Sequence, residues 1–136
     1  MRARDRLGRF VEAGDPAAVD AVPQEPRSPA QAVSLARELL SQGRAFGAHE
    51  VFEGSWKAGP ADERTLWQGL AQVCVGLTHL QRGNPVGAVT LLRRGAGHLA
   101  GQPPAYGVIP QAVAAAASSL AEQVAQNPAA QGWVSI

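Results

Sequence analysis

Prolines and glycines divide most of this chain into helix-sized pieces, and this spacing constrains the fold more than any other feature. Ser28-Pro29-Ala30-Gln31 supplies a helix N-cap, a proline at the first helical position and the glutamine of a capping box. Gly43, Gly59-Pro60 and Gly83-Asn84-Pro85 mark the next boundaries, and Asn127-Pro128 ends the last piece. Because the connections are this short, consecutive helices must lie antiparallel to one another.

Apolar residues recur at helical spacing between these boundaries, for example at Leu66, Leu70 and Leu77. We expect helices over residues 29–42, 45–57, 62–82, 85–99 and 110–126, with a loop over residues 101–109. No segment shows the alternation that is typical of a strand. The predicted fold class is therefore all-α, a small antiparallel bundle of about four to five helices built from helix hairpins.

The two ends of the chain lack such a pattern. Residues 1–27 contain Pro16, Pro23 and Pro26, which break any long helix, so we expect a flexible, extended or disordered N-terminal arm. Residues 28–127 then form a single helical domain, and residues 128–136 form a tail, in which Trp133 either docks on the domain or marks a protein contact.

Composition excludes several classes of protein. The net charge is +1, and four of the arginines (Arg2, Arg4, Arg6 and Arg9) lie in the first ten residues, which we expect in a solvated arm because no basic stripe continues into the helices. This pattern does not favour nucleic-acid binding. The N-terminus lacks the apolar run of a signal peptide, and no segment approaches the ~20 apolar residues of a membrane span, so we expect a cytoplasmic protein. The lone Cys74, between valines, indicates a buried and unreactive thiol.

One helical face in the 45–57 segment carries unusual chemistry. At about 100° per residue, Phe46, His49, Glu53 and Trp56 fall on a single narrow face, so that a histidine and a carboxylate lie between two aromatic rings. Removing such ionisable groups from water is unfavourable unless they are paired or hydrogen-bonded. We therefore expect His49 and Glu53 to have partners from the next helix, from a metal ion or from a ligand.

The next helix supplies candidate partners. In an antiparallel hairpin that turns near Gly59-Pro60, residues whose numbers sum to about 121 lie opposite each other, which places Gln68 across from Glu53 and Gln72 across from His49. This arrangement allows two interpretations. The cluster is a structural network that fixes the helix register, or it is a metal or ligand site. The spacing His-Glu-x-x-Glu differs from the His-Glu-x-x-His of zincins, and only two good metal ligands are visible.

Three segments carry a resemblance to a known family: Ala48–Trp56, Trp67–Gln72 and His79–Ala88. In order and spacing they resemble the signature segments of the bacterial and archaeal domain of unknown function 309 family, over approximately residues 39–99. The resemblance implies a small helical bundle. Some classifications label members of this family as metal-dependent hydrolases, which would imply chemistry at the same face.

Two functions follow as hypotheses. In the first, a polar site between the two helices binds a divalent metal ion or a small ligand and supports hydrolysis. In that case His49 and Glu53 would be metal ligands and Glu50 would be the catalytic base. The ligand-binding residues would be Trp56, Gln68 and Gln72. In the second, the chain is a non-catalytic interaction module that binds a partner helix or a second copy of itself, and the polar cluster is structural. An open cavity with a third metal ligand beside His49 and Glu53 would favour the first.

Overall fold

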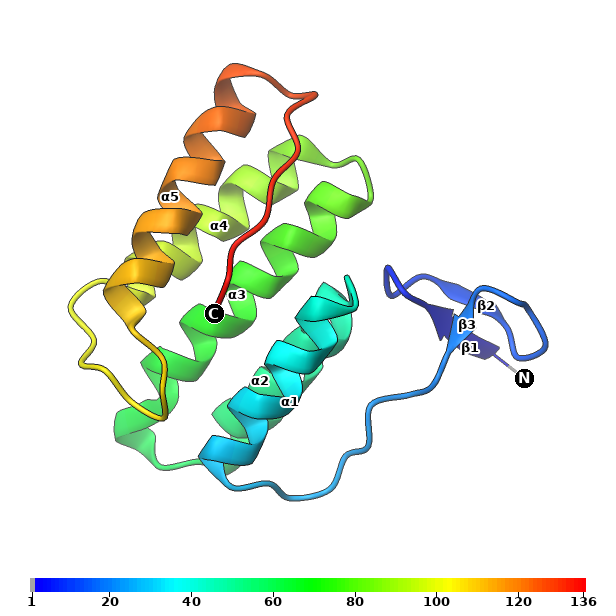
Figure 1. Ribbon diagram of the computed structural model, residues 1–136, viewed down its shortest axis with the longest axis horizontal. Helices are drawn as coiled ribbons and strands as arrows, with labels where there is room; N and C mark the ends of the chain where they lie inside the picture. Colours follow the sequence, from blue (N-terminus) through cyan, green and yellow to red (C-terminus); the bar gives the residue numbers. More distant parts are fainter. Residues whose placement is uncertain (1) are drawn as a thin grey trace.

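The computed structural model describes residues 2–136, in which antiparallel helices form a small bundle and a minor three-stranded sheet lies at the N-terminal end (Figure 1). The helices are α1 (Pro29–Ser41), α2 (Ala45–Ala58), α3 (Arg64–Gln81), α4 (Pro85–Leu99) and α5 (Pro110–Gln126), with a short 3-10 turn, η1 (Ala61–Glu63), before α3. The predicted helical bundle is confirmed. The third helix differs at its start, because residues 61–63 form the 3-10 turn rather than the first turn of an α-helix.

The predicted caps explain where the helices begin and end. At the start of α1, the Ser28 hydroxyl accepts a hydrogen bond from the Gln31 amide, and the Gln31 side chain accepts one from the Ser28 amide. At the start of α4, the Asn84 side chain accepts a hydrogen bond from the Gly87 amide. Gly43 and Gly83 follow their helices with φ angles of 71° and 74°, which is the left-handed conformation that glycine adopts without strain.

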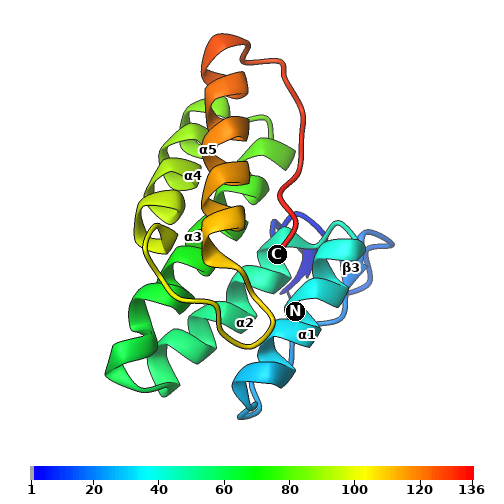
Figure 2. The same cartoon turned by 60° about the vertical axis from the view of Figure 1, so that its left-hand side comes forward.

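Helix α3 is the centre of the bundle, since α2 and α4 both pack against it, while α1 packs on α2 and α5 on α4 (Figure 2). Leu70, Val73 and Leu77 of α3 are completely buried. Cys74 is completely buried among them, and burial raises the pKa of its thiol, so it behaves as a core residue as predicted. None of the helices within residues 2–136 has the length and apolar character needed to cross a membrane.

Glycines allow α3 and α4 to approach closely. A Cβ atom on Gly69 would lie 2.8 Å from Leu99, and one on Gly76 would lie 2.8 Å from Leu92. A Cβ on Gly95 would lie 2.9 Å from two backbone atoms of α3, the carbonyl oxygen of Gly69 and the nitrogen of Val73. Gly69, Gly76 and Gly95 therefore lie where the two helices come close together.

The N-terminal segment contains strands, so the prediction of a strand-free chain is wrong here. The strands are β1 (Arg2–Asp5), β2 (Phe10–Glu12) and β3 (Ala18–Val19), and they pair antiparallel in the order β2-β1-β3. Arg4 of β1 lies opposite Phe10 on one side and Val19 on the other. Strands of two to four residues are too short to produce a recognisable alternation in the sequence.

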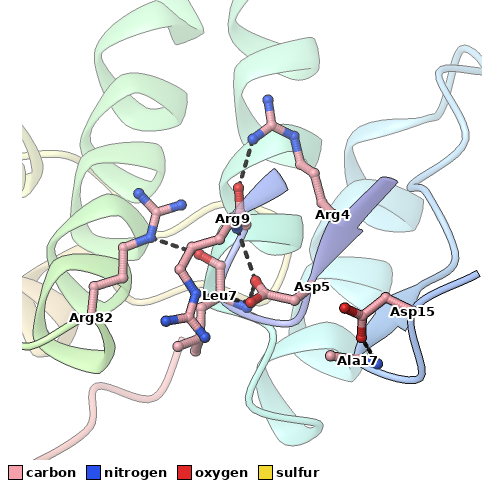
Figure 3. Close-up of polar contacts among 8 residues, drawn as sticks. Arg4, Asp5, Leu7, Arg9, Asp15, Ala17 and Arg82 are labelled. Atoms are coloured by element: carbon pink, nitrogen blue, oxygen red, sulfur yellow. Dashed lines mark hydrogen bonds and ion pairs between the residues drawn. The ribbon is translucent and has the colours of Figure 1, made fainter. Parts of the chain in front are cut away.

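A tight turn between β1 and β2 holds this sheet together (Figure 3). The buried carboxylate of Asp5 accepts hydrogen bonds from the amides of Leu7 and Arg9, both at 2.9 Å, and from Arg9 Nε at 2.8 Å. Burial alone would raise the pKa of Asp5, but the hydrogen bonds and the charge of Arg9 together lower that pKa below its usual value. Arg82, just after α3, donates to the Leu7 carbonyl at 2.8 Å and so ties the turn to the bundle.

The C-terminal tail is also docked. It returns from the end of α5 along the helices (red in Figure 1), where Val134 is buried and Trp133 stays 40% exposed. Arg37 of α1 donates hydrogen bonds of 2.7 Å to the carbonyls of Gly107 and Ile136, so one side chain holds both the α4–α5 loop and the chain end.

Candidate functional site

The polar face of α2 finds its partners mainly within its own helix. His49 Nε2 lies 2.8 Å from Glu53 Oε2, and the other oxygen of Glu53 lies 2.8 Å from Lys57 Nζ. The hydrogen bond from Lys57 and the neighbouring His49 hold the pKa of Glu53 below its usual value, against an opposing contribution from burial. The three side chains therefore form a continuous polar row along α2, at i, i+4 and i+8.

Both ring nitrogens of His49 face acceptors. Nδ1 lies 3.2 Å from the Phe46 carbonyl oxygen, while Nε2 faces the Glu53 carboxylate. Both ring nitrogens are therefore already engaged with oxygen atoms of α2 itself. A metal ion at either nitrogen would have to replace one of these contacts, because ligation uses the lone pair of a ring nitrogen.

The predicted pairs between α2 and α3 are not formed. Gln72 lies on the α4 side of α3, where its Oε1 is 2.6 Å from His98 Nδ1. Gln68 is half-buried and makes no side-chain hydrogen bond within residues 2–136. The number rule sets only how far along the two helices residues lie, and Phe52 and Trp67 do meet near the expected level, with ring centroids 6.1 Å apart. The face that α3 turns to α2 carries the apolar Trp67 there, whereas Gln72 lies on the α4 side.

The histidine of α3, His79, is also held by a separate contact. His79 lies at the α3–α4 turn, where its Nδ1 is 3.1 Å from Asn84 Nδ2. Burial, and then the charge of Arg82, lower the pKa of His79. Across the described part of the chain, residues 2–136, no three His, Cys, Asp or Glu side chains come together as metal ligands. The sequence-based site therefore supplies two neighbouring groups, His49 and Glu53, without a third.

Trp56 and Trp67, in the α2–α3 hairpin, both pack against other residues of the core. Trp56 is partly buried and packs against the hydrophobic core. Trp67 is completely buried, with its ring 6.1 Å from that of Phe52 and 5.7 Å from that of Tyr106. The indole nitrogen of Trp67 donates to Glu63 at 3.3 Å, which satisfies its only polar group.

Glu50 is the predicted site residue that lies beside open space. It lines a cavity of about 320 Å³ between the N-terminal sheet and α2, which we call the sheet–helix cavity. It also lines a second cavity, of about 380 Å³, beside the linker that precedes α1. Burial raises the pKa of Glu50, while the charges of His49, Arg4 and Arg44 oppose that rise.

The walls of the sheet–helix cavity combine aromatic and basic side chains. Phe46 of α2 and Phe10 of β2 provide the aromatic surface. The guanidinium of Arg4 lies between them, 4.0 Å from the Phe10 ring centre and 4.7 Å from that of Phe46. The remaining basic wall comprises three further arginines: Arg2, Arg6 and Arg44.

Sequence reasoning missed this cavity, because it assigned Arg2, Arg4 and Arg6 to a solvated arm. A local signal was present, however. Asp5 followed by Gly8 is the pattern of a type I turn, with Asp at the first position and Gly at the fourth, and Phe10-Val11 after it favours a strand. The turn returns the chain onto Phe46, which lies against Gly8.

Comparison with known proteins agrees with the motifs in the helical hairpin. Residues 33–91 match the family described as Domain of unknown function (DUF309). This span includes His49, Glu50 and Glu53 but neither the N-terminal sheet nor α5. Searches among curated proteins and among solved structures found no match. Residues 33–91, which run from α1 into α4, are thus similar in sequence to the domain of unknown function 309 family.

Proposed function

We propose that this protein binds a small ligand in the sheet–helix cavity, with Glu50 as a polar contact. The observation that carries this proposal is the position of Glu50, a half-buried carboxyl group that lines an open cavity and lies within the family-matching segment. Ionisable groups with perturbed pKa values in clefts are enriched at functional sites. Burial shifts the pKa of Glu50 in this way.

The size and lining of the cavity support the same function. Small-molecule sites usually have volumes of roughly 300–1,000 Å³ and combine apolar walls with a few polar groups. The sheet–helix cavity, at about 320 Å³, falls at the lower end of this range and has Phe10 and Phe46 on its walls. Its size therefore suits a ligand with about one ring and one polar group. Such binding requires no hydrolysis, and it is compatible with the non-catalytic alternative.

Titration of the protein with small aromatic probes tests this proposal. We expect benzyl alcohol, benzylamine or benzoate to shift the amide NMR signals of Phe46, Gly47 and Glu50. Ala21 is exposed and lines the cavity, so Ala21→Phe should reduce the access of these probes and weaken binding by about tenfold. The matched control is Ala125→Phe, at an exposed position of α5. Absence of shifts with all three probes, or equal binding by the Ala21→Phe variant, would exclude the cavity as the site.

A metal-dependent hydrolase is the second candidate function. It is favoured by one observation, the side-by-side placement of His49 Nε2 and Glu53 Oε2 at i, i+4 on a partly exposed face of α2. A divalent ion could bind there if His49 and Glu53 exchanged their mutual contact for the ion and Glu53 released Lys57, with water completing the coordination. Glu50 would then be the candidate base, about 100° around the helix from His49.

Metal titration separates this candidate from ligand binding. If His49 and Glu53 form a metal site, calorimetry with Zn²⁺ should give stoichiometric binding to the parent protein and at least about tenfold weaker binding to His49→Ala and Glu53→Gln. His98→Ala serves as the control, because His98 lies on α4 and bonds to Gln72. Equal Zn²⁺ binding by the parent and both site variants would reject the metal site.

A further inference from the structure

Within residues 2–136, the arginines of the sheet–helix cavity form no ion pair with a carboxylate. The ion pairs found within residues 2–136 involve Arg9 and Arg93 but none of the four cavity arginines, Arg2, Arg4, Arg6 and Arg44. Arginine side chains lining a concave surface without a protein counter-ion raise the local concentration of small anions. The basic wall therefore has unused capacity to bind negative charge.

Two of these arginines are positioned by contacts that leave donors free. Arg4 uses Nη1 to donate to the Gly8 carbonyl at 2.6 Å, and its planar group is held between two aromatic rings. Arg44 donates from Nη2 to the Asp20 carbonyl at 2.7 Å. A guanidinium has five N–H donors, so each side chain retains several donors for a carboxylate or phosphate oxygen. Side chains that are already fixed lose less conformational entropy when they bind.

The acidic side chains of the cavity do not fully neutralise these arginines. The Asp5 carboxylate is occupied by the Leu7 and Arg9 amides and by Arg9 Nε. Glu50 lies within the electrostatic influence of Arg4 and Arg44, so its charge faces two of the four cavity arginines. Asp20 is exposed at the rim. An anion in the cavity would therefore meet more unpaired positive than negative charge.

The aromatic side chains define the rest of the ligand. Phe10 is 58% exposed, although it belongs to a strand, and Phe46 extends the same apolar surface from α2. A ring placed against these two side chains would bury apolar area that is now partly in water. A long polyanion fits this site less well, because the basic side chains surround a small concavity and do not continue as a stripe along the helices.

We propose that the ligand of the sheet–helix cavity is a small molecule with an oxyanion, either a carboxylate or a phosphate monoester, attached to an apolar ring. This inference rests on the proposed ligand-binding function and specifies its chemistry. The arginines bind the oxyanion through charge-assisted hydrogen bonds, while Phe10 and Phe46 contact the ring.

Phenyl phosphate and benzoate are the test probes, with benzyl alcohol and benzylamine as neutral and cationic probes that carry the same ring. In amide NMR titrations of the full chain at low salt, we expect the two anions to bind at least about tenfold more tightly than benzyl alcohol and to weaken as salt is added. Arg6→Gln and Arg44→Gln should each weaken phenyl phosphate binding by about tenfold. Arg94→Gln, at an exposed position of α4, is the matched control.

The Arg6→Gln variant keeps the test interpretable if Arg44→Gln disturbs the start of α2, because Arg6 is exposed and makes no side-chain hydrogen bond within the described residues. Tighter binding of benzylamine or benzyl alcohol than of phenyl phosphate would overturn the oxyanion inference and leave the small-ligand proposal standing. Unchanged anion binding in both arginine variants would also overturn it. If no probe shifts the signals of Phe46, Gly47 and Glu50, both proposals fail together.

Discussion

Replacing Gly95 by alanine is expected to destabilise the bundle by about 1–3 kcal/mol, as overpacking of a core does. Alanine normally favours a helix over glycine by about 1 kcal/mol, so the predicted effect has the opposite sign to helix propensity. The added methyl group would lie 2.7 Å from a side-chain carbon of Val73 and 2.9 Å from two backbone atoms of α3. Backbone atoms cannot rotate away, and α4 must therefore move as a unit. Urea denaturation followed by circular dichroism measures this change.

Gly97→Ala is the matched control on the same helix. Gly97 is exposed, and apart from the local backbone of its own helix no heavy atom of residues 2–136 lies within 4 Å of the position that its Cβ would occupy. This substitution should stabilise the protein by up to about 1 kcal/mol through helix propensity alone. Two substitutions of identical chemistry, two residues apart, should thus change the free energy of unfolding in opposite directions. Stabilisation by both would mean that α3 and α4 are not as close as the structure places them.

Gly8→Ala should release the N-terminal sheet from α2 while the helices stay folded. Gly8 has a φ of 79°, a conformation that costs other residues about 1–2 kcal/mol. A Cβ atom there would also lie 2.3–2.8 Å from the atoms of the Phe46 ring. We therefore expect residues 2–22 to lose most of their protection against amide hydrogen exchange. Far-UV circular dichroism should keep its helical signal, and binding of the cavity probes should be lost.

The same segment contains its own control. Gly14 has no neighbouring atom within 4 Å of its Cβ position, so Gly14→Ala should leave hydrogen exchange and probe binding close to those of the parent. If residues 2–22 of the Gly8→Ala variant are as well protected against hydrogen exchange as those of the parent, then contact between the turn and Phe46 is not what holds the sheet in place. Amide hydrogen exchange, measured by mass spectrometry on peptides from both ends of the chain, would show directly whether the sheet has been released and whether the helices have stayed folded.

The helices could be predicted because local chemistry specifies them. Ser28 and Gln31 form the capping box within four residues of sequence, and Gly83 and Asn84 end one helix and start the next in the same way. The apolar spacing of α3 identified its buried face because a helix repeats every 3.6 residues over eighteen residues. Each of these signals lies within a few residues of the feature that it determines.

The sheet and the cavity depend instead on contacts between distant residues. Arg82 holds the Leu7 carbonyl across 75 positions of sequence, and Arg44 donates to the Asp20 carbonyl across 24. Neither contact leaves a periodic pattern in the sequence. The facing residues of α2 and α3 were predicted from a uniform helical rise, which sets their level along the axis but not which face of α3 points to α2. Thus Gln72 meets His98 rather than His49.

The sheet–helix cavity has two walls of different sequence origin. Arg44, Phe46 and Glu50 belong to the segment that matches the family, whereas Arg2, Arg4, Arg6 and Phe10 precede it. A chain that kept residues 33–91 but carried another N-terminal segment would retain the Glu50 side of the cavity and present different chemistry opposite it. Selectivity could therefore change between relatives through exchange of a short leading segment, with the helical bundle left intact.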